Sequence, residues 1–242
     1  MSGFIHRIQL SDSAPVGKYP FSLPVLEKLR EDSLTVSPGV TFFVGENGSG
    51  KSTLIEGIAV ASGLNAEGGS QNNRFSTRSS ESSLGSFLTL VKGSQKPRSK
   101  FFLRAESFYN LATETELLGP EQAAVFGGAS LHELSHGESF ISVMANRFYP
   151  RGLYIMDEPE AALSPQGCIT VLSLMADLVR EGCQLIVATH SPILLALPGA
   201  LIYEIDTDGE IVRREYVDAM PVQLTRSFLD NPERFLRHLT PE

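Results

Sequence analysis

The stretch Gly45-Glu46-Asn47-Gly48-Ser49-Gly50-Lys51-Ser52-Thr53 fits the pattern G-x-x-x-x-G-K-[ST], which is known as the P-loop. The apolar run before it, residues 40–44, is typical of a buried strand. Apolar residues at helical spacing follow it, namely Leu54, Ile55, Ile58 and Ala59. The pattern needs this context of strand, loop and helix, because a glycine-rich turn that merely contains a lysine would lack it.

The residue types of this loop suit a polyphosphate ligand. Glycines let the backbone approach the phosphates and point successive N–H groups at them. The new helix adds the positive end of its dipole. The pattern predicts that Lys51 contacts the β- and γ-phosphates, that Ser52 is a ligand of Mg²⁺, and that Thr53 supports the α-phosphate.

Length and composition narrow the class of protein. The 242 residues suffice for one large or two small domains, and 42% of them are hydrophobic. The sequence contains no apolar run of membrane-spanning length, and residues 1–10 do not resemble a secretory signal. Cys168 and Cys183 lie in apolar segments without His or Cys at ligand spacing, so we expect reduced core thiols in a cytoplasmic protein.

Charge is distributed unevenly along the chain. The net charge of −8 does not favour nucleic acid or anionic membranes as partners of the whole surface. Residues 71–104, however, hold seven Lys or Arg (74, 78, 92, 96, 98, 100 and 104) and one acidic residue, Glu81. This basic segment either contacts nucleic-acid phosphates, or meets an acidic protein surface, or is a solvated loop.

Hydrophobic periodicity predicts alternating strands and helices. The expected strands cover residues 4–10, 34–36, 40–44, 101–106, 153–156 and 184–189, with a hairpin formed by 201–205 and 211–216. The expected helices cover 51–62, 83–91, 107–118, 137–148, 165–179 and 222–239, while 25–30 fits a short helix or a strand and 65–83 a mobile loop. The alternation predicts an α/β fold with a mostly parallel sheet covered on both faces.

A second motif is the segment Leu153-Tyr154-Ile155-Met156-Asp157-Glu158-Pro159, an apolar strand that ends in two carboxylates. This is the form called Walker B. Asp157 is the predicted holder of Mg²⁺, directly or through water, and Glu158 the predicted general base for an attacking water. Alone, the pair could be a strand that stops at an acidic turn; next to a P-loop it favours nucleotide hydrolysis.

Two shorter motifs indicate a function only in combination with the P-loop and the Walker B motif. Ser135 and Gly137 open a predicted helix and suit an anion, although Ser135 with Glu138 also fits an ordinary capping box. His190 follows a buried strand, where an imidazole can reach a phosphate or an attacking water. A lone histidine is more often structural.

The order of these four motifs resembles the ATP-binding-cassette (ABC) ATPases, and the match spans residues 40–191. The resemblance implies a P-loop NTPase fold with an ABC-like, mostly parallel sheet, an N-terminal antiparallel β portion and a small helical lobe. It implies a single ABC-type domain over 1–242. Residues 64–150 would form the lobe with the mobile basic loop and the signature motif, and 200–242 a hairpin and a helix.

The same resemblance assigns roles to the motif residues. Two copies would bind head to tail, with each ATP between residues 45–53 of one copy and Ser135 and Gly137 of the other. Glu158 would be the base, His190 the switch histidine, and residues 161–164 the D-loop that links the two sites. ATP and Mg²⁺ are therefore the expected cofactors.

Some positions depart from the family pattern. His136 and Glu138 replace a Gly and the Gln of the usual Leu-Ser-Gly-Gly-Gln signature. The candidate for the Q-loop, and for a further Mg²⁺ ligand, is Glu106, which follows a predicted strand. Tyr19 and Phe21 are candidates for stacking on adenine, or are core residues.

Three functions remain open at this point. Only 84 positions separate Lys51 from Ser135, which leaves no room for the coiled coil of Rad50 or SMC proteins. The signature and the segment 104–108 resemble small soluble AAA-family ATPases related to Rad50, RecF and OLD. This favours a stand-alone ATPase that forms a homodimer and acts on a protein or nucleic-acid partner. The alternatives are the ATP-binding subunit of an ABC transporter and a regulatory ATP-binding module with little turnover.

Overall fold

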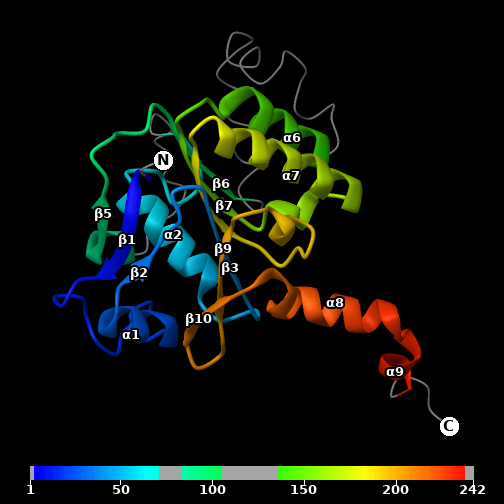
Figure 1. Cartoon of the computed structure of the whole chain (residues 1–242). Coiled ribbons are helices and arrows are strands. Elements are labelled where there is room, and N and C mark those ends of the chain that lie inside the picture. Colours follow the sequence, from blue (N-terminus) through cyan, green and yellow to red (C-terminus); the bar gives the residue numbers. More distant parts are fainter. Residues whose placement is uncertain (1–2, 71–82, 105–135, 238–242) are drawn as a thin grey trace.

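The computed structural model describes residues 3–70, 83–104 and 136–237, which form two β-sheets and the helices around them (Figure 1). The larger sheet has seven strands in the order β10-β9-β3-β8-β7-β6-β4. Its strands are β3 (Val40–Gly45), β4 (Gly69–Ser70), β6 (Lys100–Arg104), β7 (Leu153–Asp157), β8 (Gln184–Ala188), β9 (Leu201–Ile205) and β10 (Ile211–Arg214).

The five central strands of this sheet run parallel, and only the two outer strands, β10 and β4, are antiparallel. Every residue of β3, β7 and β8 is buried. A parallel sheet is covered on both faces, which explains why these strands are continuous apolar runs without alternation. The predicted α/β class with a mostly parallel sheet is confirmed.

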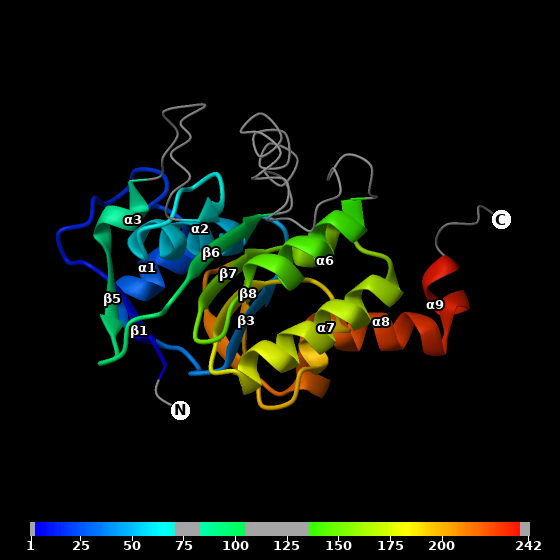
Figure 2. The same cartoon turned by 90° about the horizontal axis from the view of Figure 1, so that it is seen from above.

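The smaller sheet is the predicted N-terminal antiparallel portion, with β1 (Ile5–Leu10) between β2 (Leu34–Thr35) and β5 (Leu88–Lys92). It lies on the same side of the large sheet as α1 (Pro24–Glu31) and α2 (Lys51–Ala61) (Figure 2). The opposite face carries α6 (His136–Arg147) and α7 (Pro165–Arg180).

Two cores result, one on each face. Alternate residues of a strand point to opposite faces, so Phe42 packs with α6 and α7 while its neighbour Phe43 packs with α1 and α2. Tyr154 and Ile155 of β7 divide in the same way. Cys168 and Cys183 are buried free thiols on the α7 side, and burial raises the pKa of each.

Several helix boundaries follow from local signals. Ser164 caps α7, because its hydroxyl accepts a hydrogen bond from the N–H of Gly167 at 3.1 Å, and Pro165 occupies the first turn. Helix α2 stops at Ser62, followed by Gly63 at φ +83°, as the sequence predicts. Residues 25–30 are helical, which decides between the two alternatives.

The prediction of a helix over residues 83–91 is wrong. Only α3 (Leu84–Phe87) is helical, and the chain then enters strand β5. Leu88 and Leu90 of β5 pack toward the core, whereas Thr89 is exposed. Pairing with β1, where Leu88 lies opposite Leu10, overrides the local helical preference.

The single C-terminal helix expected over 222–239 is two helices, α8 (Met220–Asp230) and α9 (Pro232–Leu236). Asn231 separates them: its side chain accepts the N–H of Arg234 at 3.2 Å and caps α9. The next residue is a proline, which suits the first turn of a new helix and not the interior of an old one. The helix expected over 107–118 lies outside the described residues.

Gln184 connects the two sheets. It is buried, its Oε1 accepts the N–H groups of Phe4 and Ile5 at 2.9 Å each, and its Nε2 donates to the carbonyls of Ile5 at 2.7 Å and Ser37 at 2.8 Å. One amide thereby satisfies four backbone groups that have little access to water. Among the described residues, no helix is both long and apolar enough to cross a membrane.

We expect Gln184→Leu to lower the free energy of unfolding by about 3 kcal/mol or more, because it leaves buried backbone groups unpaired. Gln223→Leu, on the exposed surface of α8, is the matched control and should stay within about 0.5 kcal/mol of the unchanged protein. Urea denaturation followed by circular dichroism measures both. Equal midpoints for the two variants would contradict the anchoring role.

Candidate active site

The P-loop occupies the turn between β3, which ends at Gly45, and α2, which begins at Lys51. Gly45 has φ +151°, and a Cβ there would lie 2.2 Å from the carbonyl oxygen of Ile205. Gly48 and Gly50 adopt φ +86° and +91°, in the left-handed region. A side chain at Gly45 is therefore excluded by contact, and those at Gly48 and Gly50 are disfavoured by backbone strain.

Lys51 is nearly fully buried at the start of α2, with 4% of its surface exposed. Its Nζ donates to the carbonyls of Gly45 and Glu46, at 2.8 Å each. Burial lowers the pKa of Lys51, while the carboxylates of Glu158, Asp157 and Glu160 act in the opposite direction. An ammonium has three donors, so one remains for a ligand.

A cavity of about 290 Å³ lies over the P-loop. Glu158 lines it opposite residues of the P-loop, although the two segments are far apart in the sequence. The lining residues are Tyr19, Leu23, Asn47, Gly48, Gly50, Lys51, Ser52, Thr53 and Glu158. The P-loop and the Walker B motif thus share one cavity.

The two candidates for adenine stacking differ in their positions. Tyr19 lines the cavity and is 73% exposed, so its ring is accessible to a ligand. Phe21 is 2% exposed and packs edge-on against Phe87 with ring centroids 5.2 Å apart. Phe21 is therefore a core residue, and Tyr19 remains the candidate.

Asp157 ends β7 and is 4% exposed. Its neighbour in the register is Arg104, the last residue of β6, whose Nε lies 3.6 Å from Asp157 Oδ2. The same guanidinium bonds Glu56 of α2 at 3.1 Å. Arg104 thus connects the Walker B carboxylate to the helix that begins with the P-loop lysine, a role that the sequence analysis missed.

Glu158 has φ +49°, a left-handed conformation that costs energy for a residue other than glycine. Its N–H donates to the carbonyl of Ala188 at 3.0 Å, which ties this conformation to the end of β8. Its Oε1 lies 3.7 Å from His190 Nε2. Strained residues of this kind concentrate at functional sites, and here the strain aims Glu158 at the cavity.

The backbone of His190 is bonded by Glu160, a residue that no motif indicated. The carboxylate of Glu160, in the short 3₁₀ helix Pro159–Ala162, accepts the backbone N–H of His190. Within the described part of the chain, the buried His190 Nε2 and Glu160 Oε2 have no hydrogen-bond partner. The imidazole thus keeps a bonding position next to Glu158 available for a ligand or a water.

The signature motif lies only partly in the described structure. Gly137 is in the first turn of α6, and a Cβ there would lie 2.9 Å from the carbonyl oxygen of Ala162. The signature glycine therefore packs against the predicted D-loop of the same chain and does not line the cavity over the P-loop. Ser135 and Glu106 lie outside the described residues.

The donor set suits Mg²⁺ in the way nucleotide enzymes bind it. No group of three or more His, Cys, Asp or Glu side chains forms a cation cage in residues 3–70, 83–104 and 136–237. Mg²⁺ in such proteins uses one or two carboxylates with phosphates and waters, for which Asp157 and Ser52 are the right groups. Ser49 Oγ is buried without a hydrogen-bond partner among the described residues, as expected of a loop whose polar groups serve a phosphate.

Comparison with known proteins agrees with this geometry. Residues 25–119 match the family described as an AAA domain, and this span includes the whole P-loop and α2. Over these residues the chain is similar to AAA domains. This match, together with short matches to ABC ATP-binding proteins, confirms the resemblance to P-loop ATPases that the order of the motifs indicates.

Two curated relatives share a short stretch with the chain. An energy-coupling factor transporter ATP-binding protein, EcfA, from Methanosphaera stadtmanae is 36% identical over 59 residues, which is 24% of this chain. A putative ABC transporter ATP-binding protein from Methanothermobacter thermautotrophicus is 38% identical over 60 residues, or 25% of this chain. The match spans 21% of the length of each relative.

The solved structures that align with this chain share less sequence identity with it than the two curated relatives do. The SMC head domain from Thermotoga maritima aligns over 88% of this chain and 99% of its own, at 17% identity and a TM-score of 0.48. A nucleotide-free ATP-binding cassette from an ABC transporter aligns over 99% and 100%, at 16% identity and a TM-score of 0.47. With scores below 0.5, these likenesses add nothing to the fold that the strand order already defines.

The two glycines Gly45 and Gly48 form a matched pair for testing the loop. Both have positive φ, but a Cβ at Gly48 meets no atom within 4 Å, whereas one at Gly45 meets the Ile205 carbonyl. We expect Gly48→Ala to cost about 1 kcal/mol of stability, from backbone strain alone. Gly45→Ala should cost at least about 2 kcal/mol, since overpacking adds to the strain. Thermal unfolding measures the difference, and equal losses would contradict the close contact with β9.

Proposed function

We propose that this chain is an ATP hydrolase of the ABC type, acting as a single domain that binds ATP with Mg²⁺ and couples hydrolysis to a partner. The observation that carries the proposal is the cavity shared by Lys51 and Glu158. It combines a glycine-rich phosphate cradle with a carboxylate held in a strained conformation.

The P-loop supplies binding. Backbone N–H groups of residues 45–53 and the start of α2 face the phosphates, and Lys51 donates to the β- and γ-phosphates. Ser52 and Asp157 would hold Mg²⁺, which would neutralise charge on the phosphate oxygens. The ion pair of Arg104 with Asp157 keeps that carboxylate oriented.

Glu158 supplies the chemistry. Its carboxylate orients the attacking water and takes its proton as general base. His190, whose Nε2 lies 3.7 Å from Glu158, donates to the γ-phosphate or to the same water. Glu160 holds the backbone of His190 and so fixes the imidazole beside the base. Catalytic hydrogen bonds are often long before the substrate is bound, and 3.7 Å is compatible with such a site.

A second copy of the chain completes the site. Ser135 and Gly137 of that copy would contact the γ-phosphate of the ATP bound to the first copy. The position of Gly137 supports this, because it is packed on Ala162 of its own D-loop and away from its own P-loop cavity. Bound ATP would then stabilise a head-to-tail homodimer.

A transporter subunit is the second candidate, and the printed names of the two curated relatives favour it. In that case the partner would be a membrane protein. If the chain is instead a stand-alone ATPase, the partner is a soluble protein or a nucleic acid. Co-purification of partners with Glu158→Gln in the presence of ATP distinguishes the two, since a membrane protein is expected only for a transporter subunit.

Glu158→Gln should bind ATP but hydrolyse it more slowly by about 10²- to 10⁴-fold, because the general base is lost. The variant should accumulate as a dimer when ATP and Mg²⁺ are present, which light scattering coupled to gel filtration measures. Glu233→Gln, exposed on α9, is the control and should hydrolyse ATP at the unchanged rate. A Glu158→Gln protein that stays monomeric at saturating ATP would overturn the dimeric site.

Lys51→Ala should weaken ATP binding by about ten-fold or more, because a charge-assisted hydrogen bond to phosphate is lost. Calorimetric titration with ATP and Mg²⁺ measures this. The double variant with Glu158→Gln should no longer dimerise with ATP. Unchanged affinity in the single variant would contradict the assignment of the P-loop.

A further inference from the structure

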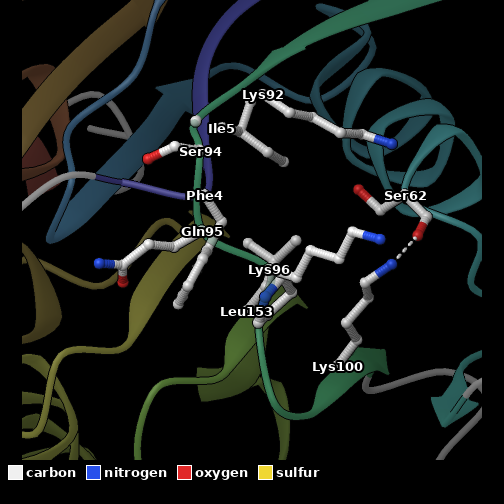
Figure 3. Close-up of a pocket in the computed structure, with 11 residues that line it drawn as sticks. Phe4, Ile5, Ser62, Lys92, Ser94, Gln95, Lys96, Lys100 and Leu153 are labelled. Atoms are coloured by element: carbon white, nitrogen blue, oxygen red, sulfur yellow. Dashed lines mark hydrogen bonds between the residues drawn. The ribbon is translucent and has the colours of Figure 1, made fainter.

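A second cavity, of about 460 Å³, lies at the opposite end of α2 from the P-loop. It is bounded by the start of β1, the end of β5, the turn at residues 93–97 and the start of β6 (Figure 3). Three lysines line it, namely Lys92, Lys96 and Lys100. The proposed ATPase site shares none of these residues.

The positive charge of this cavity is not balanced by the described chain. Its lining contains no acidic residue, and none of the three lysines forms an ion pair with any described residue. Lys100 Nζ donates to the carbonyl of Ser62 at 2.7 Å, where it meets the negative end of α2. That contact accounts for Lys100 alone. Lys92 and Lys96 add charge that the helix end does not require.

Proximity of the lysines has an energetic cost. Burial lowers the pKa of Lys100, and the charge of Lys92 lowers it further. Two cations that disfavour each other in a partly buried place are stabilised together when an anion lies between them. Binding of an anion between Lys92 and Lys100 would therefore be favourable.

Ser62 supplies a second and independent sign of a ligand. Its side chain is 4% exposed, and its Oγ has no hydrogen-bond partner among the described residues. Figure 3 shows this hydroxyl pointing into the space that the ammonium groups of Lys92, Lys96 and Lys100 also approach. A buried hydroxyl without a partner is costly unless a ligand bonds it.

The remaining wall of the cavity is apolar. Phe4 and Ile5 at the start of β1 and Leu153 at the start of β7 line it, and Pro97 of the turn at residues 93–97 adds to the apolar lining. Its volume of about 460 Å³ falls within the range of small-molecule sites, which combine apolar walls with a few converging polar groups. Charge at one side and apolar surface at the other match an amphipathic anion.

We propose that this cavity binds a small phosphate ester. The lysines and Ser62 Oγ hold its phosphate, and the apolar wall receives its organic part. A concave, partly enclosed cavity of this size favours a small molecule over the backbone of a nucleic-acid strand, which the experiment below treats as a separate outcome.

The test uses pyridoxal 5′-phosphate as a probe on the full-length protein. Its aldehyde condenses with a lysine amine, releasing water, and borohydride reduces the imine to a stable amine that peptide mass spectrometry locates. Pyridoxal, which has the same aldehyde but no phosphate, is the matched probe. Labelling at Lys51 reports the P-loop separately, so the two sites are judged independently.

We expect pyridoxal 5′-phosphate to label Lys92, Lys96 or Lys100 at least about ten-fold more than pyridoxal does, and glycerol phosphate to protect them. In Lys92→Gln/Lys96→Gln, labelling at Lys100 should fall about ten-fold or more, since two charge-assisted contacts are lost. Arg213→Gln/Arg226→Gln removes the same charge from exposed positions in β10 and α8 and should leave labelling unchanged.

Equal labelling by the two probes, or labelling of Lys100 no greater than that of the exposed Lys18, would overturn the proposal. Protection by a single-stranded 12-mer oligonucleotide but not by glycerol phosphate would also overturn it, because the site would then be a contact for a nucleic-acid backbone. Loss of labelling at Lys51 alone would count against the ATPase site and leave this proposal standing.

Discussion

The parallel pairing of β3, β8 and β7 is the constraint on which the candidate site depends. Phe43 lies opposite Ala188 in the register, and Ala188 lies opposite Asp157. The residues that follow each of these three, up to the P-loop, His190 and Glu158, must therefore emerge at one edge of the sheet. Backbone hydrogen bonds between these parallel strands therefore place the candidate catalytic residues next to one another.

Helix α2 transmits this arrangement through the molecule. It begins at Lys51, and its end at Ser62 borders the lysine-lined cavity. Between them Glu56 bonds Arg104, so the helix is fastened to β6 beside the Walker B strand. A single helix thus connects the two proposed anion sites, and the contact of Lys100 offsets the negative dipole charge at its C-terminal end.

Those parts of the fold that local sequence determines were predictable. The buried strands are apolar runs, and the P-loop and Asp157-Glu158 lie where a strand ends, so their positions followed from the sequence. Strand β5 was not predictable, because its conformation comes from pairing with β1, whose residues lie more than 70 positions away along the chain. The break between α8 and α9 at Asn231 was missed because a side-chain cap overrides the helical preference of the surrounding residues.

The site shows the same division. Lys51, Glu158 and His190 belong to motifs and were assigned roles from the sequence, whereas Arg104 and Glu160 were assigned no role at the site. Arg104 acquires its role from the register of β6 against β7, and Glu160 from a turn that reaches the backbone of His190. Both are contacts between segments distant in the chain, for which a single sequence carries no signal. Tyr19 and Phe21 could be told apart only by burial.

The anchoring of β1 by Gln184 has a practical consequence for handling the protein. The amide bonds the backbone N–H groups of Phe4 and Ile5, so this part of the chain is held against the protein interior. A Cβ at Gly3 would lie 3.0 Å from Gln184 Nε2 and 3.1 Å from the Cα of Pro38, so a side chain at residue 3 would push against this anchor. A label or purification handle is better attached at an exposed residue of α9, such as Glu233.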